Sequence, residues 1–270
     1  MVTVTGRNER PANPIDTSVP HSARIWNYWL GGKDNYPSDW AAGEEYLRVF
    51  PHMAVLAMEQ RGFHGRATRF LAAEHGIHQF LDVGTGLPTM DNTHEVAQRV
   101  APDARIVYVD NDPMVLSHAR ALLNSTPQGR TDYIDADVRD PDDIVEHAKR
   151  TLDFSRPVAV MMLGILGHVT DYDQARDIVY RLVAHLVPGS YLVICDGIRA
   201  SEARAAAQAG YNDTGAAPYR LRAPAEIAAF FQGLEILPPG VVAPNRWRPA
   251  HPELMSAPEV EARAAVGRVR

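Results

Sequence analysis

Short apolar segments alternate with helix-like segments through the middle of the 270-residue chain, and this alternation constrains the fold more than any other feature. The apolar segments are residues 80–83, 105–110, 131–135, 158–163 and 191–195. Helical patterns follow two of them, over residues 113–123 and 173–186. Strands that are apolar along nearly their whole length occur in parallel sheets that helices cover on both faces. The sequence therefore predicts an α/β fold with a mostly parallel sheet.

The segments on either side of this region differ in character. Residues 1–20 combine three prolines with polar residues, and we expect a flexible arm there. Residues 39–75 have a helical pattern that breaks at Pro51, with a third helix continuing through Phe70 and Leu71. These regions predict an arm and N-terminal helical cap over residues 1–75, ahead of the sheet.

The C-terminal part predicts an antiparallel edge to the sheet. Residues 234–237 resemble a strand, and Pro238-Pro239-Gly240 forms a turn into a second apolar pair at 241–242. We expect these two segments to pair as a hairpin. The core then covers residues 76–250 and a polar tail residues 251–270, all within one structural domain.

Composition narrows the class of partner. The formal net charge of −6 argues against a protein whose main affinity is for nucleic acid. Cys195 is the only cysteine, so the chain has no intramolecular disulfide and no cysteine-built zinc site, and we expect no metal. The first 20 residues lack the apolar run of a signal peptide, and no apolar stretch is long enough to span a bilayer. We expect a cytoplasmic protein without a membrane partner, and the oligomeric state stays open.

A glycine turn follows the first predicted strand. The segment Leu-Asp-Val-Gly-Thr-Gly at 81–86 places Gly84 and Gly86 where the backbone must turn tightly and approach a ligand. Such a turn alone is also ordinary loop chemistry. Asp110 ends the second strand, where a carboxylate can accept hydrogen bonds from both ribose hydroxyls of an adenosine. Asp112, before Pro113, can cap the next helix and leaves Asp110 for the ligand.

The same turn distinguishes between adenosine cofactors. A dinucleotide site requires a third glycine, but Thr89 stands in that region, and Pro88 has no N–H to offer a pyrophosphate. Asp82, inside the strand, would repel a pyrophosphate and suits the sulfonium and ammonium groups of S-adenosylmethionine. The methyl donor is therefore favoured. A nicotinamide-dependent oxidoreductase and a non-catalytic S-adenosylmethionine-binding protein remain alternatives.

Several segments are similar to the ordered motifs of class I S-adenosylmethionine-dependent methyltransferases: residues 81–86, 107–110, 136–138, 160–164 and 188–193. More narrowly, Trp-Asn-Tyr-Trp-Leu-Gly-Gly-Lys-Asp-Asn at 26–35 resembles the R-x-x-D/N-Y-x-L-G-G-K-D-N signature of an actinobacterial S-adenosyl methyltransferase family of unassigned substrate. Further similarity lies at 214–218, 230–235 and 239–242. The resemblance covers most of the chain. It implies a Rossmann-like fold with a mostly parallel seven-stranded sheet, an antiparallel C-terminal hairpin and an N-terminal helical cap.

The resemblance also implies which residues contact the cofactor. They are Gly84, Thr85 and Gly86 for the methionine part, Asp110 and Asn111 for the ribose, Asp137 and Val138 for the adenine, and Leu163 and Gly164 beneath the donor methyl. Leu87 and Pro88 occupy positions where such turns often carry another glycine. This departure affects the expected path of the loop rather than the fold.

The N-terminal signature suggests a lid over the cofactor. Tyr28 and Gly32 would fold over it and exclude water, and Lys33 or His21 would meet the methionine carboxylate. The alternative is that the aromatic residues are core anchors and that Lys33 is a surface charge.

One histidine is a candidate catalytic residue. Methyl transfer from a sulfonium depends mainly on alignment, but an oxygen acceptor can also require a general base. His168 follows the fourth strand, near the expected donor methyl, and a structural or capping role is its alternative. Asp171 and Asp196 are weaker candidates. The sequence thus predicts methyl transfer from S-adenosylmethionine to an unidentified small-molecule acceptor, with S-adenosylhomocysteine as product.

Overall fold

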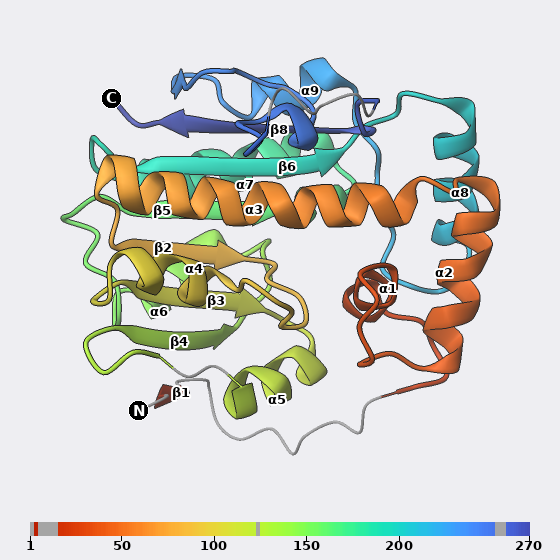
Figure 1. The fold of residues 1–270 in the computed structure, drawn as a ribbon, viewed down its shortest axis with the longest axis horizontal. Helices are drawn as coiled ribbons and strands as arrows, with labels where there is room; N and C mark the ends of the chain where they lie inside the picture. Colours follow the sequence, from red (N-terminus) through yellow and green to blue (C-terminus); the bar gives the residue numbers. More distant parts are fainter. Residues whose placement is uncertain (1–2, 5–15, 123–124, 252–257) are drawn as a thin grey trace.

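A mixed sheet runs through the computed structural model, which describes residues 3–4, 16–122, 125–251 and 258–270 (Figure 1). Its eight strands in these ranges follow the order β1-β4-β3-β2-β5-β6-β8-β7. Their bounds are β1 Thr3–Val4, β2 Gln79–Val83, β3 Arg105–Asp110, β4 Arg130–Asp135, β5 Ala159–Leu163, β6 Tyr191–Gly197, β7 Glu235–Ile236 and β8 Ala262–Arg268. β1 to β6 pair in parallel, and β8 runs antiparallel to β6 and β7. The predicted parallel core is confirmed, with its five strands as β2 to β6.

Helices cover both faces of this sheet. Side chains alternate between the faces, so Phe80 and Tyr108 join one apolar cluster while Leu81 and Val107 join the other. One face carries α3 (Met53–His75), α4 (Thr93–Val100) and α5 (Pro113–Leu122); the other carries α6 (Pro141–Ala148), α7 (Tyr172–Ala184) and α9 (Pro224–Ala229). Burial on both sides explains why these strands are apolar at nearly every position.

The C-terminal strands are antiparallel as predicted, but their pairing differs from the expected hairpin. β7 pairs with β8, where Ile236 faces Gly267, while Val242 forms only an isolated bridge to Ala264. β8 lies inside the segment predicted to be a polar tail, of which residues 252–257 fall outside the described ranges. The small side chains that suggested a tail have a packing reason, because a Cβ on Gly267 would lie 2.7 Å from the Phe231 ring.

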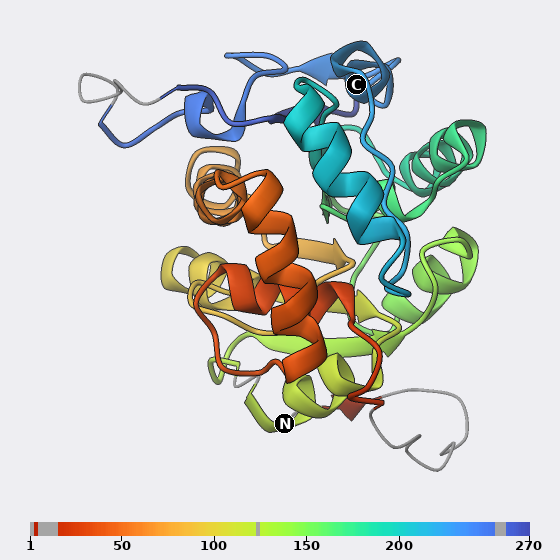
Figure 2. The same ribbon diagram turned by 90° about the vertical axis from the view of Figure 1, so that its right-hand side faces the viewer.

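Three helices form a cap beyond the carboxyl ends of the parallel strands: α1 (Ser22–Trp29), α2 (Pro37–Val49) and α8 (Glu202–Asn212) (Figures 1 and 2). The predicted breaks are confirmed, since α1 ends before Gly31, which has φ 77°, and α2 ends before Pro51. The predicted third helix is wrong, because α3 runs unbroken from 53 to 75.

The predicted arm lies partly outside the described residues, which omit 1–2 and 5–15. Its last part is held by Arg24, whose guanidinium donates to the carbonyls of Asp16 and Val19. None of the helices in the described ranges combines the length and hydropathy needed to cross a bilayer.

Removing β8 tests its place in the sheet. A chain ending at Pro258 loses a seven-residue strand that pairs with both β6 and β7. We expect it not to fold, because β6 would then expose its unpaired backbone N–H and C=O groups. The free energy lost with β8 should exceed the typical stability of a folded protein, about 5–15 kcal/mol. A control lacking only the exposed Arg270 should keep wild-type thermal unfolding by circular dichroism. Cooperative unfolding of the shorter chain would contradict this assignment.

Candidate active site

A cavity of about 250 Å³ opens at the carboxyl ends of β2, β3, β4 and β5, with α1 and α3 as its other walls. This is where open α/β sheets bind ligands, outside the strand ends and where the strand order reverses. The structure brings twelve of the predicted site residues to its lining: His21, Asp82, Gly84, Thr85, Gly86, Asp110, Asn111, Asp137, Val138, Leu163, Gly164 and His168. Tyr28, Gly32 and Lys33 do not line it.

The glycine turn has a shape that only glycine adopts easily. Gly84 and Gly86 have φ of 73° and 65°, in the left-handed region. A Cβ on Gly84 would also lie 2.5 Å from the side chain of Ile165, whereas one on Gly86 would meet nothing within 4 Å. The Gly84 N–H donates to the carbonyl of Val109 on β3 at 2.8 Å. The turn is therefore joined to the next strand and open at Gly86.

Asp110 faces this turn from the end of β3. Its carboxylate accepts from the N–H groups of Gly86 (2.8 Å), Asn111 (2.9 Å) and Asp112 (3.0 Å). Burial raises the pKa of Asp110 above its ordinary value, although the N–H groups of Gly86 and Asp112 act in the opposite direction. Asp112 accepts from the Met114 N–H at 2.8 Å, which is the cap predicted for the next helix.

Asp82 belongs to a buried polar cluster with Thr93 and His64. The Thr93 hydroxyl donates to Asp82 Oδ2 at 2.5 Å, so His64 Nε2, 2.8 Å from that hydroxyl, must be the donor to it. His64 Nδ1 is then a bare acceptor, buried and without a hydrogen-bond partner. Burial lowers the pKa of His64, which keeps the ring neutral. Both Asp82 and His64 line the cavity.

Arg61, one helix turn before His64, adds a half-buried cation to the same wall. Its Nε and Nη2 donate to the Met90 carbonyl at 3.0 and 2.8 Å, and Nη2 also donates to Asn92. Among the described residues no carboxylate lies within ion-pair distance of it. Burial lowers the pKa of Arg61, but an arginine stays charged. Neither Arg61 nor His64 was predicted from the sequence, where their spacing of three residues in a helical segment was the one indication that they share a helix face.

The helix α1 covers the cavity with a face different from the one expected. Ala23, Trp26, Asn27 and Leu30 line the cavity, at helical spacing. Tyr28 turns toward α2 instead, where its hydroxyl donates to Glu44. Lys33 is exposed.

Asn27 explains the signature at residues 26–35, with its Gly-Gly-Lys sequence at 31–33. Its Oδ1 accepts from the Asp34 N–H at 3.0 Å and from Asn35 Nδ2 at 2.7 Å, and a Cβ on Gly32 would overlap its side chain. The loop after α1 therefore wraps around one buried amide. The signature positions α1, and Gly32 is required for close approach to Asn27.

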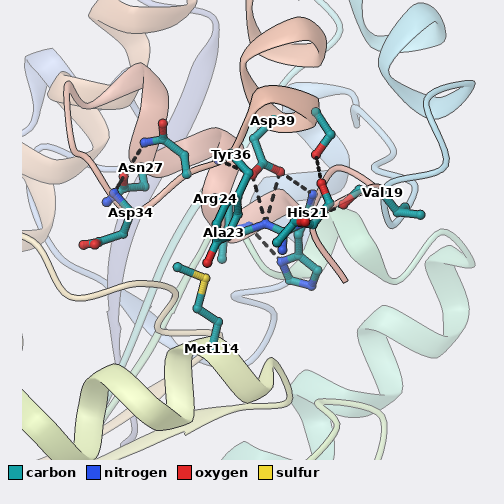
Figure 3. Close-up of polar contacts among 12 residues, drawn as sticks. Val19, His21, Ala23, Arg24, Asn27, Asp34, Tyr36, Asp39 and Met114 are labelled. Atoms are coloured by element: carbon teal, nitrogen blue, oxygen red, sulfur yellow. Dashed lines mark hydrogen bonds and ion pairs between the residues drawn. The ribbon is translucent and has the colours of Figure 1, made fainter. Parts of the chain in front are cut away.

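A buried carboxylate holds α1 in place. Asp39, fully buried on α2, accepts from the N–H groups of His21 and Tyr36, both at 2.9 Å, and forms an ion pair with Arg24 at 3.0 Å (Figure 3). His21 in turn lies 2.9 Å from Asp112 Oδ2. Although burial acts against it, His21 holds the pKa of Asp112 below its ordinary value. The cap is thereby connected to the loop that carries Asp110.

On the adenine side of the expected site, Asp137 already has a partner. It accepts from the Arg139 N–H at 2.9 Å and forms an ion pair with the Arg139 guanidinium at 3.2 Å, with both side chains half-exposed. Arg139 also lines the cavity, and sequence analysis did not single it out. An adenine amino group would have to share Asp137 with this arginine.

Of the three candidate bases, only His168 lines the cavity. It ends a 3-10 turn, Leu166–His168, directly after β5, and its Nδ1 lies 3.0 Å from the Pro218 carbonyl. Burial lowers the pKa of His168 to about 4, so the imidazole is neutral at physiological pH. Asp171 caps α7 through the Gln174 N–H, and Asp196 accepts from the Tyr219 hydroxyl.

Comparison with known proteins now identifies the family. Residues 8–270 match the model of the S-adenosyl methyltransferase family. The chain belongs to this family. It is an S-adenosylmethionine-dependent methyltransferase, which decides between the methyl donor and a nicotinamide dinucleotide. None of the curated proteins compared with the chain matches it.

Solved structures agree with this assignment. A DUF574 family protein from Streptomyces avermitilis is 44% identical, with a TM-score of 0.90 over 94% of this chain and 99% of its own. A protein from Thermobifida fusca, provisionally named as a methyltransferase, is 40% identical, with a TM-score of 0.88 over 97% of this chain and 99% of its own. An O-methyltransferase family protein from Burkholderia thailandensis shares the fold alone, at 15% identity and a TM-score of 0.54 over 81% of this chain and 58% of its own.

Matched substitutions in the glycine turn test its geometry. Gly86→Ala places a side chain in open space at φ 65°, and we expect it to lower the unfolding free energy by about 1–2 kcal/mol from backbone strain. Gly84→Ala adds the overlap with Ile165 and should cost about 1–3 kcal/mol more. Urea titrations of both variants measure the difference. Equal losses would contradict the close approach at Gly84.

Proposed function

We propose that this cavity binds S-adenosylmethionine and that the enzyme transfers its methyl group to a small-molecule acceptor. The observation that carries the proposal is a pair of opposite charges on the cavity wall that do not bond to each other, the buried carboxylate of Asp82 and the half-buried guanidinium of Arg61. Such a pair suits the ammonium and carboxylate of an amino acid. Of the described residues near the glycine turn, these two supply what the methionine end of the donor requires.

Each charge has a partner group suited to one end of the zwitterion. The ammonium would donate to Asp82 and to the unpartnered Nδ1 of His64. The carboxylate would accept from Arg61, whose Nη1 makes no hydrogen bond to the described residues. Arg61 takes the role that the sequence suggested for Lys33 or His21.

The adenosine would extend along the other strand ends. The Asp110 carboxylate, with acceptor capacity remaining beside its three backbone donors, would hold the ribose hydroxyls. Asp137 would accept from the adenine amino group, with Val138 beside the ring. Asn111 lies next to Asp110 on the cavity wall.

The donor methyl would then lie near Leu163 and Gly164, at the end of β5. Gly164 has φ 77°, and a Cβ there would lie 2.9 Å from Gln60 Nε2. With α1 closing the cavity, the protein would align the acceptor with the methyl and sulfur and exclude water. His168 would act as general base where the acceptor carries a proton that must leave.

The dimensions of the site support a small acceptor. The volume of about 250 Å³ is close to the lower end of the roughly 300–1,000 Å³ typical of small-molecule pockets. The net charge of −6 also argues against a nucleic-acid acceptor. A cytoplasmic location belongs to the same proposal, and the free, buried thiol of Cys195 supports a reducing setting.

Binding of S-adenosylhomocysteine tests the adenosine assignment. We expect Asp110→Asn to weaken binding tenfold or more, because a charged hydrogen bond contributes about 1.5–3 kcal/mol. Asp135→Asn is the matched control, since Asp135 faces Asp110 across the β3–β4 ladder, is exposed and does not line the cavity. Isothermal titration calorimetry measures both. If the folded wild-type protein does not bind S-adenosylhomocysteine, the cofactor proposal fails.

A second comparison isolates the methionine end. Arg61→Gln should weaken binding of S-adenosylhomocysteine tenfold or more through loss of the carboxylate contact. Binding of 5′-methylthioadenosine, which lacks the amino-acid carboxylate, should change less than twofold. Arg69→Gln, on an exposed position of the same helix, should alter neither affinity. An equal loss for both ligands would show that Arg61 acts on the fold rather than on the carboxylate.

A further inference from the structure

The turn that carries His168 is held by residues 218–222, which we call the strap, and by Arg139, whose Nη2 donates to the His168 carbonyl at 2.8 Å. The Arg220 N–H donates to the Gly167 carbonyl at 2.9 Å. Arg222, fully buried, donates from Nη1 to the Leu166 carbonyl at 2.7 Å and from Nη2 to the Val169 carbonyl at 2.6 Å. The strap thus donates hydrogen bonds to the carbonyls of Leu166, Gly167 and Val169, on both sides of His168.

Tyr219 anchors the strap to the sheet. Its ring lies against Gly167, where a Cβ would overlap it, and meets the His168 ring edge to face with centroids 5.0 Å apart. Its hydroxyl donates to Asp196 Oδ1 at 2.6 Å and accepts from the Gly197 N–H at 3.1 Å. Asp196 and Gly197 both end β6. The strap, the His168 turn and the sheet therefore form one connected unit.

The strap also determines which nitrogen of His168 carries the proton. Nδ1 lies 3.0 Å from the Pro218 carbonyl, and a carbonyl can only accept. Nδ1 therefore donates, and the lone pair of Nε2 accepts no hydrogen bond from a described residue. Burial of the ring and the guanidinium of Arg139 after β4 both disfavour an imidazolium. The ring is thus a neutral proton acceptor at the cavity wall.

We propose that the strap fixes His168 as its Nδ1–H tautomer so that Nε2 takes the proton of an acceptor hydroxyl, and that Tyr219 and Asp196 are positioning residues for this base. The inference rests on the proposed function and deepens it. In the step, the acceptor oxygen forms a bond to the methyl carbon while the sulfur–methyl bond breaks, and its electron pair stays on sulfur as the thioether of S-adenosylhomocysteine. The hydroxyl proton moves to Nε2, and the imidazolium then releases it to water.

The same geometry narrows the class of acceptor. A neutral amine already offers a lone pair and needs no base, whereas a neutral hydroxyl becomes strongly nucleophilic only as its proton leaves. Ala23, Trp26 and Leu30 supply an apolar wall from α1. The acceptor is therefore a small hydroxyl compound with an apolar body, and the reaction is O-methylation.

The tautomer is directly measurable. In long-range ¹H–¹⁵N spectra of histidine-labelled protein, His168 should be the Nδ1–H tautomer at pH 7, with its signals assigned by their loss in His168→Gln. Tyr219→Phe keeps the ring but loses the bond to Asp196, and we expect a mixture with the Nε2–H form. Asp196→Asn retains an acceptor and should stay close to wild type. Tyr180→Phe, at an exposed site on α7, should change nothing.

Two results of that experiment overturn the positioning proposal. One is an Nε2–H tautomer in the wild type. The other is an unchanged tautomer in a folded Tyr219→Phe variant. The affinity of the Tyr219→Phe variant for S-adenosylhomocysteine should remain within about twofold of wild type, because Tyr219 does not line the cavity. Failure of the wild type to bind S-adenosylhomocysteine would instead count against the proposed function.

Product chemistry tests the acceptor class. The enzyme is supplied with ¹³C-methyl S-adenosylmethionine and a metabolite extract of the source organism, and the ¹³C shift of the transferred methyl separates O-methyl from N-, S- and C-methyl. An O-methyl product, formed about tenfold more slowly by Tyr219→Phe at unchanged KM, supports the inference. An N-, S- or C-methyl product overturns it. Absence of any product from protein that binds S-adenosylhomocysteine overturns both this inference and methyl transfer itself.

Discussion

Parallel pairing of β2 with β3 on one side and β5 on the other is the constraint on which the site depends. Parallel strands end at the same edge, so the turn at Gly84, the carboxylate of Asp110 and the bend at Gly164 meet although they are far apart in the chain. The pairing also places each following helix on one face or the other. A cavity at that edge is a consequence of the sheet, and the side chains around it decide its chemistry.

Buried charged side chains connect the helical cap to this edge of the sheet. Asp39 accepts hydrogen bonds from two N–H groups and forms an ion pair with Arg24, and the His21 side chain lies beside Asp112. A carboxylate buried this completely is stable only when its oxygens are fully paired, so α1 has little freedom to rotate. That orientation directs Trp26 and Asn27 into the cavity and Tyr28 away from it. The helix itself therefore covers the cavity, with a face other than the one predicted.

Site residues at strand ends were easier to predict from the sequence than site residues on helix faces. Asp82, Asp110 and Gly84 follow strands whose apolar runs are unmistakable, and a parallel sheet needs no further information to bring them together. Arg61 and His64 lie within a long helix whose polar and apolar positions give no sign of which side meets the sheet. β8 was missed for a related reason: its alanines and glycine resemble a tail until Phe231 and Leu234 are seen packed against them.

The sequence by itself determined the parallel sheet, the glycine turn, the preference for a sulfonium cofactor and the resemblance to a methyltransferase family. These depend on local patterns, because a strand end and its following residue are neighbours in the chain. Only the tertiary structure decided that α3 supplies an arginine and an imidazole nitrogen to the cavity wall, the first without a carboxylate partner and the second without a hydrogen bond among the described residues. It also decided that the strap orients His168 through Nδ1. Those features depend on contacts between residues fifty or more positions apart, such as His168 and Pro218, which no local pattern records.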